Sequence, residues 1–166
     1  MHIRRNPTED EVFEVINSLR EEEEKEITNL LESPAGIAMS SVSNSKHCYV
    51  IMDETHPVAI CGIIDEENAD IVSGIIWIMT SVKVYEQPIA FYKECKKLVN
   101  AYSTQYDRLF NYVAVEAESH QWFNDSLGFG LCPEVYEHKD TGQQYYMFEY
   151  ISQRGIESML AVEPAK

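Results

Sequence analysis

The sequence predicts one α/β domain built on a mixed sheet with helices on both of its faces. Apolar segments of strand length alternate with segments in which apolar residues recur at helical spacing. Between residues 71 and 115 the order is strand, helix, strand, and a crossover of this kind requires part of the sheet to be parallel. The chain has 166 residues, of which 45% are hydrophobic. That is enough for one buried core and too little for two ordinary domains.

The N-terminal part predicts a short strand, residues 2–5, followed by two helices. Thr8 is a suitable N-cap, and the acidic residues 9–11 suit a first helical turn. The apolar residues that follow at helical spacing are Val12, Phe13, Ile16 and Leu19. A second helix, or a continuation of the first, covers residues 21–31 and ends at Pro34. Its run of glutamates predicts a solvated helix face.

The middle of the chain predicts three strands. Residues 35–46, rich in small and serine side chains, predict a loop or a short irregular helix. Residues 47–53 and 58–64 then form a hairpin of two buried strands, and residues 71–81 form another strand after a turn.

The C-terminal part predicts two helices and three strands. Pro88 suits the first position of a helix, and a strand follows over residues 108–115. Ser119 is the predicted N-cap of a shorter helix that Gly128 ends. The last two strands, joined by a turn, are residues 129–138 and 143–151. We expect one domain over residues 1–152 and a tail over residues 153–166 that adds little to the core.

The composition restricts the partners of the protein. Its formal net charge is −15, from 28 acidic and 13 basic residues. This charge repels phosphate backbones and anionic lipid, so direct nucleic-acid binding and membrane association are not expected. It favours a basic protein partner or mimicry of nucleic acid, although acidic charge also simply keeps proteins soluble.

The cysteines and the apolar runs indicate a soluble protein with reduced thiols. The four cysteines lack the paired spacing of a zinc site and the density of a disulfide scaffold, and no metal site is predicted. The longest apolar runs, residues 60–64 and 75–79, are far shorter than the roughly 20 residues of a membrane helix. The first residues lack the apolar stretch of a secretory signal.

Two short motifs extend the prediction to a family. The string Asn111-Tyr112-Val113, and then Leu127-Gly128-Phe129 at the end of a helix, together with the order of elements, resembles the GNAT superfamily of N-acetyltransferases over most of residues 3–150. The resemblance implies a twisted, mostly antiparallel mixed sheet of six to seven strands with about four helices. It also implies acetyl-CoA in a V between two splayed strands, with its pyrophosphate at the N-terminus of the next helix. The implied cofactor contacts are Met79, Thr80, Ser81, Val82, Gln87, Ile89, Ala90 and Asn124.

A narrower resemblance is to GNAT-like proteins of short-tailed bacteriophages, which include internal virion proteins and acetyltransferases. It rests on Ile76-Trp77-Ile78-Met79, Pro88-Ile89-Ala90-Phe91, the two motifs above and His120. The resemblance implies a phage protein in the host cytoplasm or associated with the virion. We expect Trp77 in the core and Trp122 to be partly buried.

The chain departs from the GNAT pattern at the cofactor. In place of the superfamily's Arg/Gln-x-x-Gly-x-Gly/Ala loop the chain has residues 84–90, where only Gln87 and Ala90 can be fitted to the pattern and both glycines are missing. Pro88 lacks an amide donor, and Glu86 places negative charge near a phosphate. The usual asparagine and tyrosine of the following helix are replaced by Ala117 and Asn124. The titratable candidates for a catalytic base that remain near the expected cleft are Tyr85, Glu116, Glu118 and His120.

Two functions are therefore open. The first is an acetyl-CoA-dependent N-acetyltransferase, in which an amine attacks the thioester and Glu116, His120 or Tyr85 handles the proton. The second is an inactive GNAT scaffold, acting as a phage accessory or virion protein that binds a basic host or virion protein. The sequence does not predict the oligomeric state.

Overall fold

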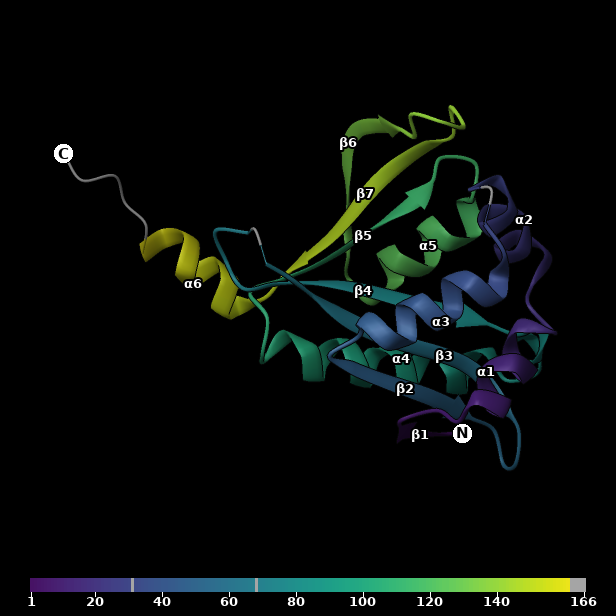
Figure 1. The fold of residues 1–166 in the computed structure, drawn as a ribbon. Coiled ribbons are helices and arrows are strands. Elements are labelled where there is room, and N and C mark those ends of the chain that lie inside the picture. The colour runs from purple at the N-terminus through teal and green to yellow at the C-terminus, as the bar shows by residue number, and fades with distance from the viewer. Residues whose placement is uncertain (31, 68, 162–166) are drawn as a thin grey trace.

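The computed structural model describes residues 1–30, 32–67 and 69–161. Seven strands form one sheet in the order β1-β2-β3-β4-β5-β7-β6 (Figure 1). Of these neighbours only β4 and β5 are parallel. The predicted mixed, mostly antiparallel sheet is therefore confirmed. Leu31, at the predicted end of the second helix, Asn68 in a predicted turn and residues 162–166 of the predicted tail lie outside the described residues.

The first half of the chain contains β1 (His2–Arg5), α1 (Glu9–Ile16), α2 (Glu21–Asn29) and α3 (Pro34–Asn44). Thr8 caps α1 as predicted: its hydroxyl accepts from the amide of Glu11, and the Glu11 carboxylate accepts from the amide of Thr8. Helix α3 differs from the predicted loop or short irregular helix, because it runs for 11 residues. Ser33 caps it and Pro34 occupies its first turn, so this pair starts α3, whereas α2 already ends at Asn29.

The second half contains the strands and helices in the predicted order. They are β2 (His47–Met52), β3 (Pro57–Glu66), β4 (Ser73–Thr80), the 3₁₀ turn η1 (Val82–Glu86), α4 (Pro88–Ser103), β5 (Arg108–Ala114), α5 (Glu118–Leu127), β6 (Gly130–Glu137), β7 (Gln144–Ile151) and α6 (Gln153–Ala161). Ser119 is not the N-cap of α5, because the helix already begins after Ala117. The side-chain amide of Gln121 donates to the carbonyls of Ala114 and Val115, which stabilises this earlier start.

Helix α6 lies in the segment predicted to be a tail. Its first turn packs on the loop before β5, where the amide of Ser152 donates to the carbonyl of Asp107 at 2.9 Å. A Cβ at Gly155 would lie 2.2 Å from that same carbonyl oxygen, so only glycine permits this approach. The rest of α6 extends away from the sheet (Figure 1).

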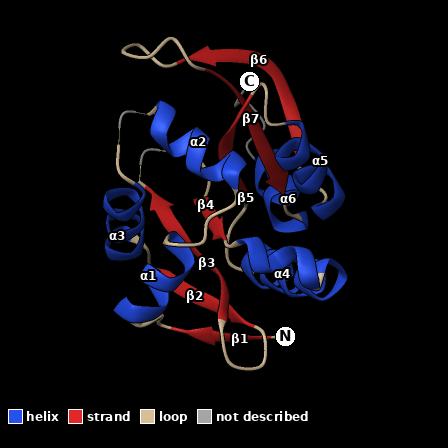
Figure 2. Cartoon of the chain, turned by 90° about the vertical axis from the view of Figure 1, so that its right-hand side faces the viewer, coloured by secondary structure: helices blue, strands red, loops and turns tan. Residues whose placement is uncertain are grey.

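Two apolar cores lie on opposite faces of the sheet (Figure 2). One is formed with α4 and α5 and contains Phe91, Val99, Leu109 and Phe129. The other is formed with α1, α2 and α3 and contains Val15, Ile27, Ala38 and Met79. Within residues 1–30, 32–67 and 69–161, no helix combines the length and apolar character needed to cross a membrane.

Replacing Gly128 with valine is expected to lower the free energy of unfolding by more than about 1 kcal/mol. Gly128 ends α5 at φ 100°, as predicted, in the left-handed region that a β-branched residue tolerates poorly. Urea unfolding measures the loss. Gly130→Val is the control, because a Cβ there meets nothing within 4 Å and the residue lies in extended backbone. Equal stabilities for the two variants would contradict the assignment.

The buried thiols make the fold sensitive to alkali. Burial raises the pKa of Cys95 from 9.0 to about 12, helped by the nearby charge of Glu94, and burial raises that of Cys48 to about 11. Above pH 9 the unfolded chain therefore loses thiol protons that the folded chain keeps, and stability falls as the pH rises toward 11 to 12. We expect urea unfolding midpoints under reducing conditions to fall between pH 8.5 and 10.5, and to fall less in Cys95→Ala.

Candidate functional site

A V-shaped opening separates β4 from β5. The two strands pair only at Ser73↔Arg108, Gly74↔Leu109 and Ile75↔Phe110. Beyond these pairs β4 stays with β3 and β5 stays with β7, so the strands diverge. At the point of divergence the side-chain amide of Asn111 donates to the carbonyl of Ile76 at 2.6 Å. The residues Asn111-Tyr112-Val113 thus lie on one arm of the V.

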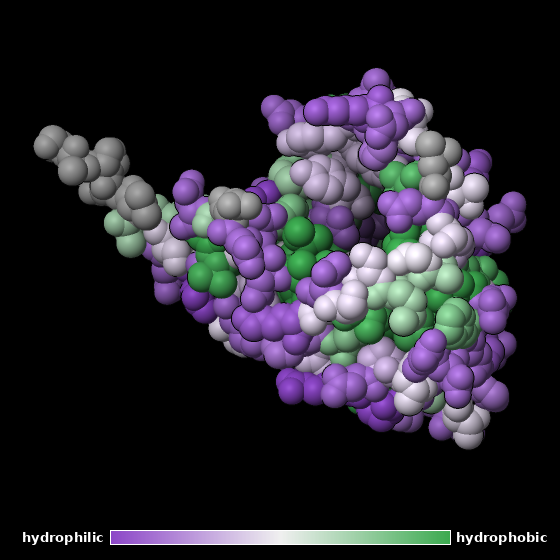
Figure 3. All heavy atoms as spheres, viewed as in Figure 1, coloured by the Kyte–Doolittle hydropathy of each residue, from purple (hydrophilic) through white to green (hydrophobic). Residues whose placement is uncertain are grey.

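A cleft of about 1070 Å³ occupies this opening. Its walls include Phe91 and Val99 from the core under α4, and Ile27 and Met79 from the core under α2 and α3. The cleft therefore passes through the sheet from one face to the other. On the face shown in Figure 3 the surface is hollowed between α2 and α3 on one side and the β6–β7 hairpin on the other.

The structure brings about half of the predicted site residues to this cleft. Those that line it are Met79, Thr80, Tyr85, Ile89, His120 and Asn124. Those that do not are Ser81, Val82, Gln87, Ala90 and Glu116. Their roles remain predictions. Trp122 also lines the cleft, but it is 72% exposed rather than partly buried, because the neighbouring Phe123 faces the core and Trp122 lies about 100° further round the helix.

Backbone groups at the end of β4 form hydrogen bonds with the segment at residues 18–23. The amide of Thr80 donates to the Glu23 carboxylate at 2.8 Å, and its carbonyl accepts from the amide of Arg20. The amide of Val82 donates to the carbonyl of Ser18 at 2.8 Å, and Leu19 pairs with Ser81 as an isolated bridge. The backbone groups of Thr80 and Val82 that the GNAT resemblance assigns to the cofactor therefore already have partners.

The connection from β4 to α4 is the 3₁₀ turn η1 rather than a glycine loop. Pro88 occupies the first turn of α4, so the amides of Ile89 and Ala90 are the donors that this helix end offers. Ile89 is 71% exposed at the same mouth of the cleft. Lys83, in the same 3₁₀ turn, forms an ion pair with the Glu14 carboxylate at 2.9 Å.

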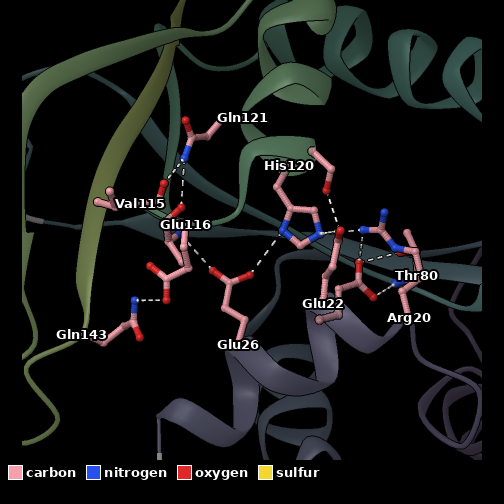
Figure 4. Close-up of polar contacts among 12 residues, drawn as sticks. Arg20, Glu22, Glu26, Thr80, Val115, Glu116, His120, Gln121 and Gln143 are labelled. Atoms are coloured by element: carbon pink, nitrogen blue, oxygen red, sulfur yellow. Dashed lines mark hydrogen bonds and ion pairs between the residues drawn. The ribbon is translucent and has the colours of Figure 1, made fainter.

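A polar cluster forms the cleft wall beside α2 (Figure 4). Nδ1 of His120 lies 3.3 Å from a carboxylate oxygen of Glu26, and Nε2 lies 2.8 Å from the guanidinium of Arg20. Because guanidinium only donates, Nε2 accepts and the ring proton sits on Nδ1 toward Glu26. This arrangement leaves the unprotonated nitrogen on the side of Arg20.

Arg20 and Glu23 form the buried centre of this cluster. The guanidinium bonds to the Glu23 carboxylate at 2.7 Å, and Glu23 is only 7% exposed. Burial alone would lower the pKa of Arg20, but the charge and hydrogen bond of Glu23 outweigh burial and raise it. The guanidinium therefore stays charged, and the ion pair holds the two side chains in place.

Helix α2 and its N-cap supply candidate site residues that the sequence analysis did not predict, because they lie within or beside the glutamate run. That run was interpreted as a solvated face, but Glu23 and Ile27 are buried. Arg20, Glu23 and Ile27 follow one another at three- and four-residue spacing, which places them on one helix face, and this signal was available in the sequence. The candidate Glu116 instead accepts from the side-chain amide of Gln143 at 2.7 Å.

Solved structures with this fold include acetyltransferases. A probable acetyltransferase from Staphylococcus epidermidis matches with a TM-score of 0.71 at 14% identity, over 92% of this chain and 99% of its own. A mutant of the spermidine N-acetyltransferase of Vibrio cholerae gives 0.66 at 12% identity, over 96% and 99%. The ribosomal-protein-alanine N-acetyltransferase of Brucella melitensis gives 0.65 at 12%, over 91% and 99%.

These likenesses show that the chain has the fold of GNAT acetyltransferases. No family profile matches the chain, and no curated protein matches it by sequence.

Proposed function

We propose that this protein is an N-acyltransferase that takes an acyl group, acetyl in the simplest case, from a coenzyme A thioester and transfers it to an amine. The observation that carries the proposal is the cleft in the V, which joins the two faces of the sheet and has His120 in its wall. Such a passage lets a donor enter from one face and an amine from the other.

The cleft fits the acyl-pantetheine and phosphate groups of the donor, whereas the Thr80 amide is not free to bind it. Its largely apolar walls fit an acyl-pantetheine arm, and the amides of Ile89 and Ala90 at the start of α4 suit a phosphate. When bound, the coenzyme supplies an activated acyl carbon. The carboxylate of Glu23 must release the Thr80 amide before that amide can hydrogen-bond to the donor.

His120 is the residue we assign as the general base. Glu26 orients its ring through Nδ1, and Nε2 carries the lone pair that accepts the proton of the attacking amine. Arg20 must yield its hydrogen bond to Nε2 for this to occur. Glu22, whose carboxylate accepts from the Ser119 hydroxyl and lies 3.8 Å from Nε2, adds negative charge that attracts an ammonium group.

Acetyl-CoA titration by calorimetry tests the proposal. We expect micromolar binding, and binding at least about tenfold weaker for Ala90→Asp, because a carboxylate at the start of α4 repels a phosphate there. Ala90→Gln is the neutral control. Binding should be followed by release of free thiol when primary amines are added. No heat with the wild-type protein would contradict the proposal.

The net charge of −15 and the bonded end of β4 favour a second candidate function. In it, the GNAT fold is a scaffold whose acidic surface binds a basic protein, and the phage resemblance adds host and virion proteins as candidate partners. If the protein is such a scaffold, it should release no thiol from a coenzyme A thioester with any amine. Its affinity for the basic protein should fall steeply as the salt concentration is raised.

A further inference from the structure

The part of the cleft that runs along the α4 and α5 face of the sheet is apolar, and we call this branch of the cleft the arm. Its floor includes Ile76 and Ile78 of β4, and its roof includes Leu98 of α4 and Phe123 of α5. These four side chains are only partly buried, although they pack against the core. The arm is therefore open space inside the domain rather than a gap closed by packing.

Contacts between α4 and α5 close the top of this arm. Phe91 and Phe123 stack with their centroids 5.7 Å apart. The Tyr92 hydroxyl donates to the carbonyl of Ser126 at 2.9 Å, and Lys96 donates to that of Leu127 at 2.8 Å. These contacts cover the arm on the side of α4 and α5.

The charge in the cleft lies away from this arm. Of the described residues that line the cleft, the acidic and basic ones are Arg20, Glu23, Glu26 and Glu137, together with the histidines His120 beside α2 and His138 after β6. The first three belong to the polar cluster beside α2, and Glu137 lies at the end of β6. A phosphate, sugar or ammonium group in the apolar arm would lose its water without gaining a partner, whereas a hydrocarbon chain would not.

Tyr102 also lines the cleft and carries an unsatisfied polar group. The residue is 5% exposed, and its hydroxyl has no hydrogen-bond partner within the part of the chain that the structure describes. A buried hydroxyl of this kind is costly unless something completes its bonding. A trapped water or a polar atom of a ligand that reaches it would do so, whereas a hydrocarbon chain would not.

We propose that this arm binds a hydrocarbon chain longer than acetyl, as the acyl group of the donor thioester. That the donor is a coenzyme A thioester rests on the proposed function. The preference for a hydrocarbon chain rests on the apolar lining of the arm. A cleft of about 1070 Å³ is large for an acetyl group and its pantetheine arm alone. Ligand pockets of about 300 to 1,000 Å³ hold whole drug-sized molecules.

Chain-length dependence of binding tests this inference. Calorimetric titrations with acetyl-, hexanoyl- and decanoyl-CoA, kept below the concentration at which they form micelles, give the dissociation constants. Each buried methylene strengthens binding by up to about fourfold, so the four extra methylenes of hexanoyl-CoA strengthen it by at most about 250-fold. With partial burial we expect hexanoyl-CoA to bind at least about 30-fold more tightly than acetyl-CoA. S-decanoyl-cysteamine, which has the chain and thioester without the nucleotide, is the second probe.

Leu98→Trp should fill the arm and remove the chain-length dependence, so that the variant binds hexanoyl-CoA no more tightly than it binds acetyl-CoA. Asn100→Trp is the matched control, because residue 100 is exposed on the same helix and should keep the dependence. Thermal melting of both variants confirms that they fold. If Leu98→Trp does not fold, hexanoyl-CoA against acetyl-CoA on the wild type still decides the outcome.

The outcomes separate this inference from the proposed function. Equal binding of acetyl- and hexanoyl-CoA overturns the inference and leaves the function standing. Binding of S-decanoyl-cysteamine without binding of any coenzyme A thioester supports the inference and contradicts the function. If neither class of probe binds, both are overturned, and the Tyr102 hydroxyl is then completed by water alone.

Discussion

Glu23→Ala is expected to lower the free energy of unfolding by about 3 to 5 kcal/mol, the usual cost of removing one partner of a buried ion pair. The substitution leaves the buried guanidinium of Arg20 without the charge that offsets its loss of water. It also leaves the amide and hydroxyl of Thr80 without their shared acceptor. Urea unfolding at neutral pH measures the loss.

Two control variants separate charge from hydrogen bonding. Glu24→Ala changes the exposed neighbour and should alter stability by less than about 0.5 kcal/mol. Glu23→Gln keeps an acceptor for Thr80 but removes the charge facing Arg20, so its loss should be intermediate. A loss of less than about 1 kcal/mol in Glu23→Ala would show that Arg20 finds water instead of depending on the carboxylate.

The sheet could be predicted from sequence because its strands are defined by local patterns. Apolar stretches such as residues 58–64, bounded by turn residues, match β3 closely, and Gly128 ends α5 where the left-handed conformation requires it. Helix α3 was harder to predict because its 11 residues are mostly small and weakly patterned. Its start depends on the Ser33 cap, and the Ser33-Pro34 pair was interpreted only as the end of the preceding helix.

The candidate site could be predicted only in part. The V follows from the order of elements, and residues 79, 80, 85, 89, 120 and 124 reach the cleft. The cluster around His120 could not be read from local patterns, because it joins residues 100 positions apart in the chain. The fold places α2 beside α5, so that Glu22 and Glu26 of the acidic run lie next to the His120 ring.

This cluster also bears on the two candidate functions. The Glu23 carboxylate binds the Thr80 amide, so an acyl donor that needs this amide must compete with it. A scaffold without catalysis places no demand on the same bond. The strength of thioester binding therefore measures how readily the Arg20–Glu23 pair shifts, and it separates the enzyme from the scaffold more directly than the fold does.

His120→Ala is expected to lower kcat by about 10²- to 10⁴-fold, the usual contribution of a general base. The dissociation constant for the thioester should change by less than threefold, because the ring contacts Arg20 and Glu26 rather than the start of α4. His138→Ala is the control: this histidine also lines the cleft, but it bonds to the backbone of its own turn.

Both variants need circular dichroism and melting curves, because His120 is largely buried and its removal also frees Arg20 and Glu26. If kcat falls equally in His120→Ala and His138→Ala, the loss reflects the shape of the cleft rather than proton transfer. If kcat is unchanged in His120→Ala while the wild type turns over, the amine loses its proton to water or to Tyr85. Since Tyr85 lines the same cleft, Tyr85→Phe in the His120→Ala background then tells these two routes apart.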